Sequence, residues 1–150
     1  MKAHIGVDAQ SGLVHSVIGT SANVNDATQV GALLHGDETA AFGDAGYRSV
    51  DKRQEAQGPH WHVAMQPGKR KQLDAKHPWA QMLEKAGQLK ASVRAKVEHP
   101  FHRIKNLFGH KKARYEGMVK NEAQLFCLFG LANLVIARRS LLAAHARGAS

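Results

Sequence analysis

The first part of the chain carries apolar and polar positions in short runs that are typical of β-strands. Two such runs, at about 2–7 and 13–19, flank the segment DAQSG, whose Asp, Ser and Gly residues favour a turn. This pattern predicts a β-hairpin. Shorter apolar runs at 39–43 and 61–65 predict two further strands.

A short helix is predicted between the hairpin and the third strand. Asn25 or Asp26 is suited to its N-cap, because a side-chain oxygen there accepts a hydrogen bond from a backbone N–H group that the helix leaves free. Val30 and Leu33 fall on one face of this helix, and Gly36 ends it.

The second part of the chain has the period of α-helices. From about 79 to 112, apolar residues recur at spacings near 3.6, from Leu83 to Phe108. Pro100 interrupts this pattern and removes a backbone hydrogen bond, so we expect a kink or a junction of two helices there. A last helix at about 121–145 is apolar over so wide an arc that it should pack against the sheet or a partner.

The length of 150 residues and a hydrophobic fraction of 43% suit one α/β domain with a real core. We expect residues 1–66 to be mostly strands with one helix, and 79–145 to be mostly helical. Cys127, the single cysteine, Trp61 and Trp79 are expected in the core. The sequence contains no leader-like apolar segment and no run of about 18 uninterrupted apolar residues, which favours a soluble, cytoplasmic protein with no membrane partner.

The charge of the chain is +9 and is unevenly distributed. Residues 90–120 hold 9 basic and 2 acidic groups, a local charge of +7. Such an excess favours a polyanionic partner such as DNA. A solvated helix face accounts for the charge alone equally well.

Two carboxylates are candidates for chemistry. Asp44 ends the apolar run 39–43, and the carboxyl end of a buried strand is a common place for reactive groups. Glu98 lies four residues after Arg94 and seven before Lys105, and these offsets put the three on one helix face. Judged alone, that spacing more often marks an exposed charged face.

Carboxylates from different elements suit a two-metal site for phosphoryl transfer, in which hard divalent cations are held by oxygen ligands. Asp44 and Glu98 are the candidate metal ligands and catalytic residues. The candidate contacts with DNA are the basic residues and histidine at Arg94, His102, Lys105, Lys69, Arg70, Lys111 and Lys112.

The chain resembles the DDE transposases of bacterial insertion sequences, specifically the group with a Tyr-x2-Arg-x3-Glu-x6-Lys signature. Arg94-x3-Glu98-x6-Lys105 matches the last three signature positions. FGDAGYRS and KASVRAKVEHPFHRIKNLFGHKKARYEG look like successive blocks of such enzymes, and the resemblance covers essentially the whole chain.

This resemblance implies a ribonuclease-H-like catalytic core with C-terminal helices, Mg²⁺ or Mn²⁺ as cofactor, and a homo-oligomer when active. The implied function is DNA transposition, a form of DNA recombination, by metal-dependent phosphodiester cleavage and strand transfer. The implied partners are the element's terminal inverted repeats and target DNA. By match, Asp44 takes the second acidic position and Glu98 the third, with Arg94 and Lys105 close to the transposon-end DNA.

Two departures from the family pattern bear on activity. Ala91 stands where the signature has tyrosine, and the family's first catalytic aspartate lies on a strand that would precede Met1. We therefore expect an incomplete core that lacks its first strand. Asp8 and Asp26 are at turn and cap positions, where aspartate has a routine backbone role.

Two alternatives to an active transposase remain. One is a catalytically inactive fragment that binds DNA or associates with transposase, and the other is a poorly folded remnant.

Overall fold

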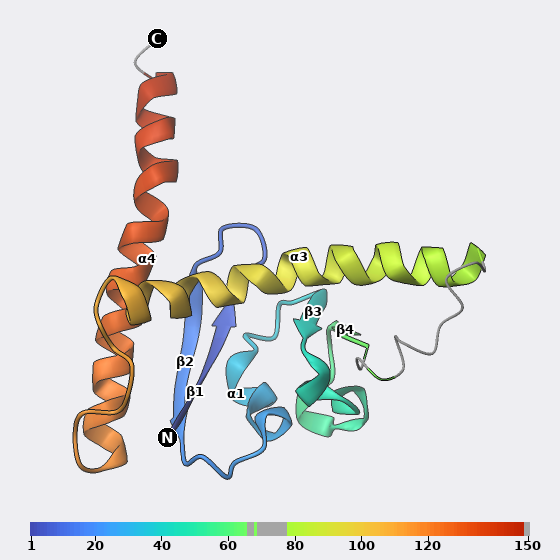
Figure 1. Ribbon diagram of the computed structural model, residues 1–150, viewed down its shortest axis with the longest axis horizontal. Coiled ribbons are helices and arrows are strands. Elements are labelled where there is room, and N and C mark those ends of the chain that lie inside the picture. Colours follow the sequence, from blue (N-terminus) through green and yellow to red (C-terminus); the bar gives the residue numbers. More distant parts are fainter. Residues whose placement is uncertain (66–67, 69–77, 149–150) are drawn as a thin grey trace. The chain divides into compact units, whose positions relative to one another are not determined.

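The computed structural model describes residues 1–65, 68 and 78–148, and the side chains of 139, 140 and 148 are outside that description. The chain divides into two compact units. Figure 1 labels helices and strands of which they are built. Unit 1 contains Met1–Val24 and Lys96–Ser150, and unit 2 contains Asn25–Ala95. Each unit has strands and helices, so the expectation of a mixed α/β protein is confirmed.

Unit 1 is built on an antiparallel hairpin of β1 (Lys2–Val7) and β2 (Val14–Thr20). Asp8 closes the turn, because its carboxylate accepts hydrogen bonds from the backbone N–H and the hydroxyl of Ser11. These two bonds lower the pKa of Asp8. The predicted hairpin, and the backbone role expected for Asp8, are confirmed.

Helix α4 (Met118–Gly148) packs against β2 and forms the core of unit 1. Its residues Leu125 and Phe129 are buried, together with Ile104 of helix α3 (Pro78–Asn106). Phe101 meets Phe129 edge to face at 5.4 Å between ring centroids, an arrangement that aromatic pairs favour. The predicted last helix therefore does pack against a sheet.

Polar side chains of α4 also cover the outer edge of β2. Asn133 exchanges two hydrogen bonds with the backbone of Val14, and the Glu122 carboxylate accepts one from the N–H of Gly19 at 3.0 Å. An uncovered strand edge would leave these backbone groups unpaired. Neither Asn133 nor Glu122 was predicted from the sequence. The signal in the sequence that could have identified them is a polar residue within an otherwise apolar helix.

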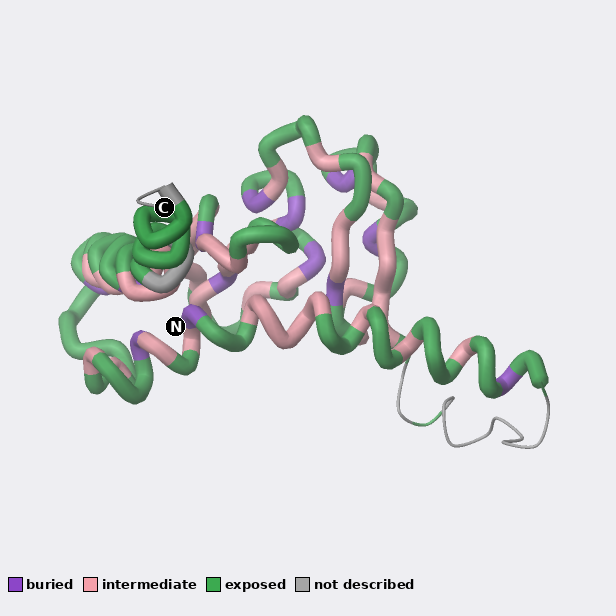
Figure 2. The backbone as a smooth tube through the Cα atoms, turned by 90° about the horizontal axis from the view of Figure 1, so that it is seen from above, coloured by how far each residue is buried: buried purple, intermediate pink, exposed green. Residues whose placement is uncertain are grey.

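The face of α4 opposite its core contacts is apolar and exposed. Val119 is 80% exposed and Leu134 68%, and Cys127 is exposed as well, so the expectation of a buried thiol is wrong. Residues 141–147, in the last turns of the helix, are exposed and are coloured green in Figure 2. One face of α4 is enough to cover the hairpin, so the rest of the wide apolar arc stays exposed.

Among the described residues, one helix is long and apolar enough to cross a membrane, at Met118–Arg147. Length and composition are weak evidence for that role, because a core helix passes the same test. Here Phe129 is buried and Asn133 is hydrogen-bonded to a strand, as in the core helix of a folded unit.

Helix α3 (Pro78–Asn106) runs through Pro100 without a break. The expected junction of two helices is therefore not found, and the predicted end at 112 lies too far along the chain. Pro100 is fully buried, so packing of its ring offsets the hydrogen bond that a helical proline removes.

Unit 2 contains a parallel pair of strands, β3 (Ala40–Gly43) and β4 (His60–Val63). A 3₁₀ turn at Asp26–Gln29 leads into the short helix α1 (Val30–Leu33), with Asn25 as N-cap. Three further 3₁₀ turns follow β3, at Ala45–Tyr47, Val50–Lys52 and Gln54–Ala56. The core of the unit consists of Val30, Val50 and Ala56, with Trp61 packed against them. Trp79 is 61% exposed, so its expected place in the core is wrong.

Candidate functional site

Asp44 directly follows β3, as the sequence predicts. Its side-chain Oδ1 accepts a hydrogen bond of 2.7 Å from the backbone N–H of Gly46 and so caps the turn Ala45–Tyr47. The residue is exposed. The strand end and the cap together hold the carboxylate at the surface of unit 2, where a ligand can reach it.

Asp26 lies beside Asp44, although the sequence suggested only a backbone role for it. A Cβ atom built on Gly46 would lie 2.9 Å from Oδ1 of Asp44 and 3.7 Å from Oδ2 of Asp26. Burial and the charges of Asp26 and Asp44 raise the pKa of Tyr47 to about 12. The two carboxylates and the phenol therefore form one cluster around Gly46. The segments that carry it are far apart in sequence, and no local pattern marks Asp26.

Gly43 permits this arrangement at the end of β3. A Cβ atom at this position would lie 2.9 Å from the Cβ of Tyr47, closer than such atoms approach in proteins. Gly43 is buried and Tyr47 is half-buried against the core of unit 2. The strand thus ends in a glycine because Tyr47 folds back over it.

The remaining predicted residues on α3 belong to two units. Arg94 is half-buried and belongs to unit 2, whereas Glu98, His102 and Lys105 are exposed and belong to unit 1. His102 contacts Asn106, one turn later, with 3.0 Å between Nδ1 and the amide nitrogen. Asp44 belongs to unit 2 and Glu98 to unit 1, so each is described within its own unit.

The other predicted DNA contacts fall in two segments. Lys111 and Lys112 lie in the exposed connection between α3 and α4. Lys69 and Arg70 lie outside the described residues.

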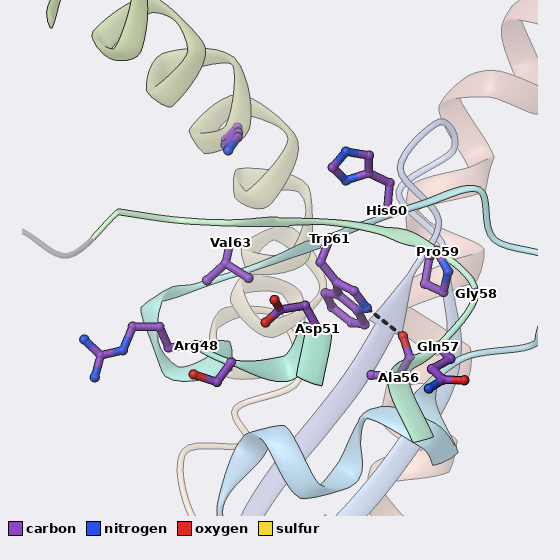
Figure 3. Close-up of a pocket in the computed structure, with 11 residues that line it drawn as sticks. Arg48, Asp51, Ala56, Gln57, Gly58, Pro59, His60, Trp61 and Val63 are labelled. Carbon is purple, nitrogen blue, oxygen red and sulfur yellow. Dashed lines mark hydrogen bonds between the residues drawn. The ribbon is translucent and has the colours of Figure 1, made fainter. Parts of the chain in front are cut away.

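Unit 2 also has an open cavity of about 650 Å³ that none of the predicted site residues lines. Trp61 forms part of its wall, and its indole N–H donates a 2.9 Å hydrogen bond to the carbonyl of Ala56 (Figure 3). Asp51 and Lys90 add one acidic and one basic group to the lining.

The carboxylates of unit 2 suit a hard divalent cation, because Asp44 and Asp26 offer oxygen ligands close together. Two carboxylates are an incomplete set. In the described part of the chain, no three or more His, Cys, Asp or Glu residues are grouped so that they could hold a metal ion. A complete site needs at least one more ligand than this cluster provides.

Comparison with known families decides the class of the protein. A family model described as "Transposase DDE domain" matches residues 1–134. The chain belongs to this family. The match includes Asp44 and Glu98, and the mixed α/β structure with small sheets is consistent with such a domain. A DDE transposase acts on DNA and depends on a divalent metal ion. No solved structure matches the chain significantly.

Proposed function

We propose that this chain acts in the DNA transposition of a bacterial insertion sequence, with Asp44 and Glu98 as metal ligands and catalytic residues. The carrying observation is the family match over 1–134, which includes an acidic residue held at the end of β3. The reaction is phosphodiester cleavage at the element's terminal repeats followed by strand transfer to target DNA. The active form is a homo-oligomer that works on DNA in the cytoplasm.

The oxygens of Asp44 and Glu98 fit Mg²⁺ or Mn²⁺ better than a softer metal. A bound cation would supply Lewis acidity that favours deprotonation of the attacking water or 3′-hydroxyl and neutralises charge on the leaving oxygen. The Gly46 N–H holds Oδ1 of Asp44, which leaves Oδ2 available as a ligand. Arg94, His102 and Lys105 hold the DNA backbone near Glu98.

We further propose a ribonuclease-H-like core in which an additional strand pairs with β1 and brings a third carboxylate. The Gly19 N–H points away from β1, toward Glu122, and Gly19 faces Ala3 across the hairpin. By the alternation of an antiparallel pair, the backbone groups of Ala3 and Ile5 point away from β2. In the described residues β1 pairs with β2 alone, and α4 covers the edge of β2, so an additional strand would pair with β1.

The second candidate function is a catalytically inactive fragment that binds DNA or associates with transposase. It is favoured by the lack, in the described residues, of three grouped ligands for a metal ion. The exposed basic segment with Lys111 and Lys112 would still bind DNA by releasing counterions.

The test is a cleavage assay on the duplex DNA that flanks the coding sequence, with Mg²⁺ or Mn²⁺. We expect salt-dependent binding and no strand cleavage by the chain alone. We expect specific nicks when a polypeptide that supplies an additional aspartate-bearing strand is added, and loss of these nicks with Asp44→Asn or Glu98→Gln.

Specific nicks made by the 150-residue chain, and abolished by Glu98→Gln, would refute the need for an additional strand. Failure to cut with the additional strand supplied, and with binding intact, would favour the inactive DNA-binding fragment. Failure to bind DNA at all would contradict the proposed function and the DNA-binding fragment, and would leave only a fragment that associates with transposase.

A further inference from the structure

The connection from α3 to α4, residues 107–117, carries three exposed cations. Lys111, Lys112 and Arg114 outnumber Glu116, the one carboxylate of the segment. We call residues 107–117 the basic loop. It belongs wholly to unit 1, so its conformation is described within one compact body.

Both ends of the basic loop are fixed by backbone geometry. At the end of α3, the His110 N–H donates to the carbonyl of Ile104 at 2.9 Å, and Gly109 has φ +65°. This is a helix stop in which a left-handed glycine lets later N–H groups bond the last carbonyls. Gly117, with φ +86°, immediately precedes α4. A side chain at either glycine would be strained.

The middle of the basic loop is held by one side chain, Asn121, in the first turns of α4. Its Oδ1 accepts hydrogen bonds from the N–H groups of Arg114 and Tyr115, both at 3.2 Å. Its Nδ2 donates to the carbonyls of Tyr115 at 2.6 Å and Gly117 at 2.7 Å. Asn121 is 5% exposed, so water does not replace these bonds.

Four bonds use the full capacity of the amide, which has two acceptor sites and two donors. An apolar residue at 121 would leave two N–H groups and two carbonyls of the loop without that partner, and would remove the four part-buried bonds that hold these backbone groups in place. Arg114 adds a bond across the loop, from its guanidinium to the carbonyl of Gly109 at 3.3 Å. The loop is therefore held in one shape in the absence of any ligand.

We propose that Asn121 is a positioning residue that holds Lys111, Lys112 and Arg114 as a preformed surface for DNA backbone phosphates. The inference rests on the proposed DNA-binding function and assigns a part of it to one loop and one buried amide. A preformed loop binds more tightly because little conformational entropy remains to be lost on binding. Guanidinium and ammonium groups are the donors that phosphate contacts use.

The experiment measures binding of a labelled duplex by fluorescence anisotropy over a series of salt concentrations. The variants are Asn121→Ala, the triple variant Lys111→Gln/Lys112→Gln/Arg114→Gln, and their combination. The matched control is Asn133→Ala, which removes an asparagine amide of the same helix that bonds β2 instead of the basic loop.

We expect the triple variant to lower the slope of log K against log salt by up to about 3, since each phosphate contact contributes about 0.9. Asn121→Ala should weaken binding about three- to tenfold and lower the slope in part. In the triple-variant background Asn121→Ala should have no further effect, because the cations that it positions are absent. Asn133→Ala should leave the salt slope unchanged.

The proposal is overturned if the triple variant binds like the unchanged chain, if the effect of Asn121→Ala persists in the triple background, or if Asn133→Ala has the same effect. No DNA binding by the unchanged chain would instead contradict the proposed function, and the role given to Asn121 with it. The results that contradict the role of Asn121 are thus distinct from the result that contradicts the proposed DNA-binding function.

Amide hydrogen exchange supplies a readout of the clamp itself, without DNA. Asn121→Ala should speed exchange of the Arg114 and Tyr115 N–H groups, and Asn121→Asp, which keeps the acceptor, should leave them protected. If Asn121→Ala does not fold, Asn121→Ser, which is too short to make these bonds and adds no charge, is taken through the binding assay with the same expected result. Equal protection in all three proteins would show that Asn121 does not hold the loop.

Discussion

Asn133 pairs with the backbone of Val14 through both ends of its amide. Its Oδ1 accepts from the Val14 N–H at 2.8 Å, and its Nδ2 donates to the Val14 carbonyl at 2.7 Å. The contact joins residues 119 positions apart and takes the place of a neighbouring strand along β2. It fixes α4 on the hairpin in one register.

Replacing Asn133 by alanine should destabilise the protein by about 2 kcal/mol, because two hydrogen bonds are lost and two backbone groups remain in a partly buried place. Urea unfolding followed by circular dichroism measures the change. Asn106→Ala is the control, since the amide of Asn106 contacts exposed His102. Equal stability of the two variants would mean that the Val14 contact does not hold α4.

The phenol of Tyr47 should ionise near pH 12, as followed by ultraviolet absorbance in a Tyr115→Phe background that leaves one tyrosine. Asp26→Asn and Asp44→Asn should each lower this pKa, because each removes a negative charge near the phenolate. Asp51→Asn is the control. Because the folded pKa is raised, stability is lost as pH rises above 10, and Tyr47→Phe should reduce this loss. A Tyr47 pKa that is unchanged in both aspartate variants would contradict the cluster around Gly46.

His110 should make unit 1 less stable in mild acid. Burial and the charge of Arg114 lower its pKa below the ordinary 6.5, and its Nδ1 is buried with no hydrogen-bond partner among the described residues. The unfolded chain therefore takes up the proton first, and stability falls as pH drops below 6.5. The urea midpoint between about pH 7 and about pH 5 should fall less in His110→Gln than in the unchanged chain. An identical pH dependence would count against a lowered pKa.

Cys127 should react with a thiol reagent in the folded chain at nearly the rate of the urea-unfolded chain, because it lies on the exposed face of α4. The reaction is followed by absorbance of the released chromophore. Strong protection in the folded chain would show that this apolar face is covered in solution. Repeating the measurement with Leu134→Lys, on the same face, would then tell whether charge uncovers it.

Turns and caps could be predicted from the chemistry of residues that are neighbours in the sequence. DAQSG predicted the hairpin turn because Asp8 and Ser11 bond within it, and SANVND predicted the cap that Asn25 makes. The placement of Asp44 at a strand end followed in the same way. At Pro100 the local rule was wrong about a junction, because burial in the core favours the continuous helix.

The sequence by itself determined the elements, the excess of basic groups in 90–120 and the family, since each depends on residue order and spacing. The tertiary structure determined which residues far apart in the sequence contact one another and which side chains are exposed. It put Asp26 beside Asp44, bound Asn133 to Val14, and left Cys127 in solvent. It also gave the basic loop its clamp at Asn121. A side chain's partners across space depend on how elements pack, and periodicity along the chain does not record that.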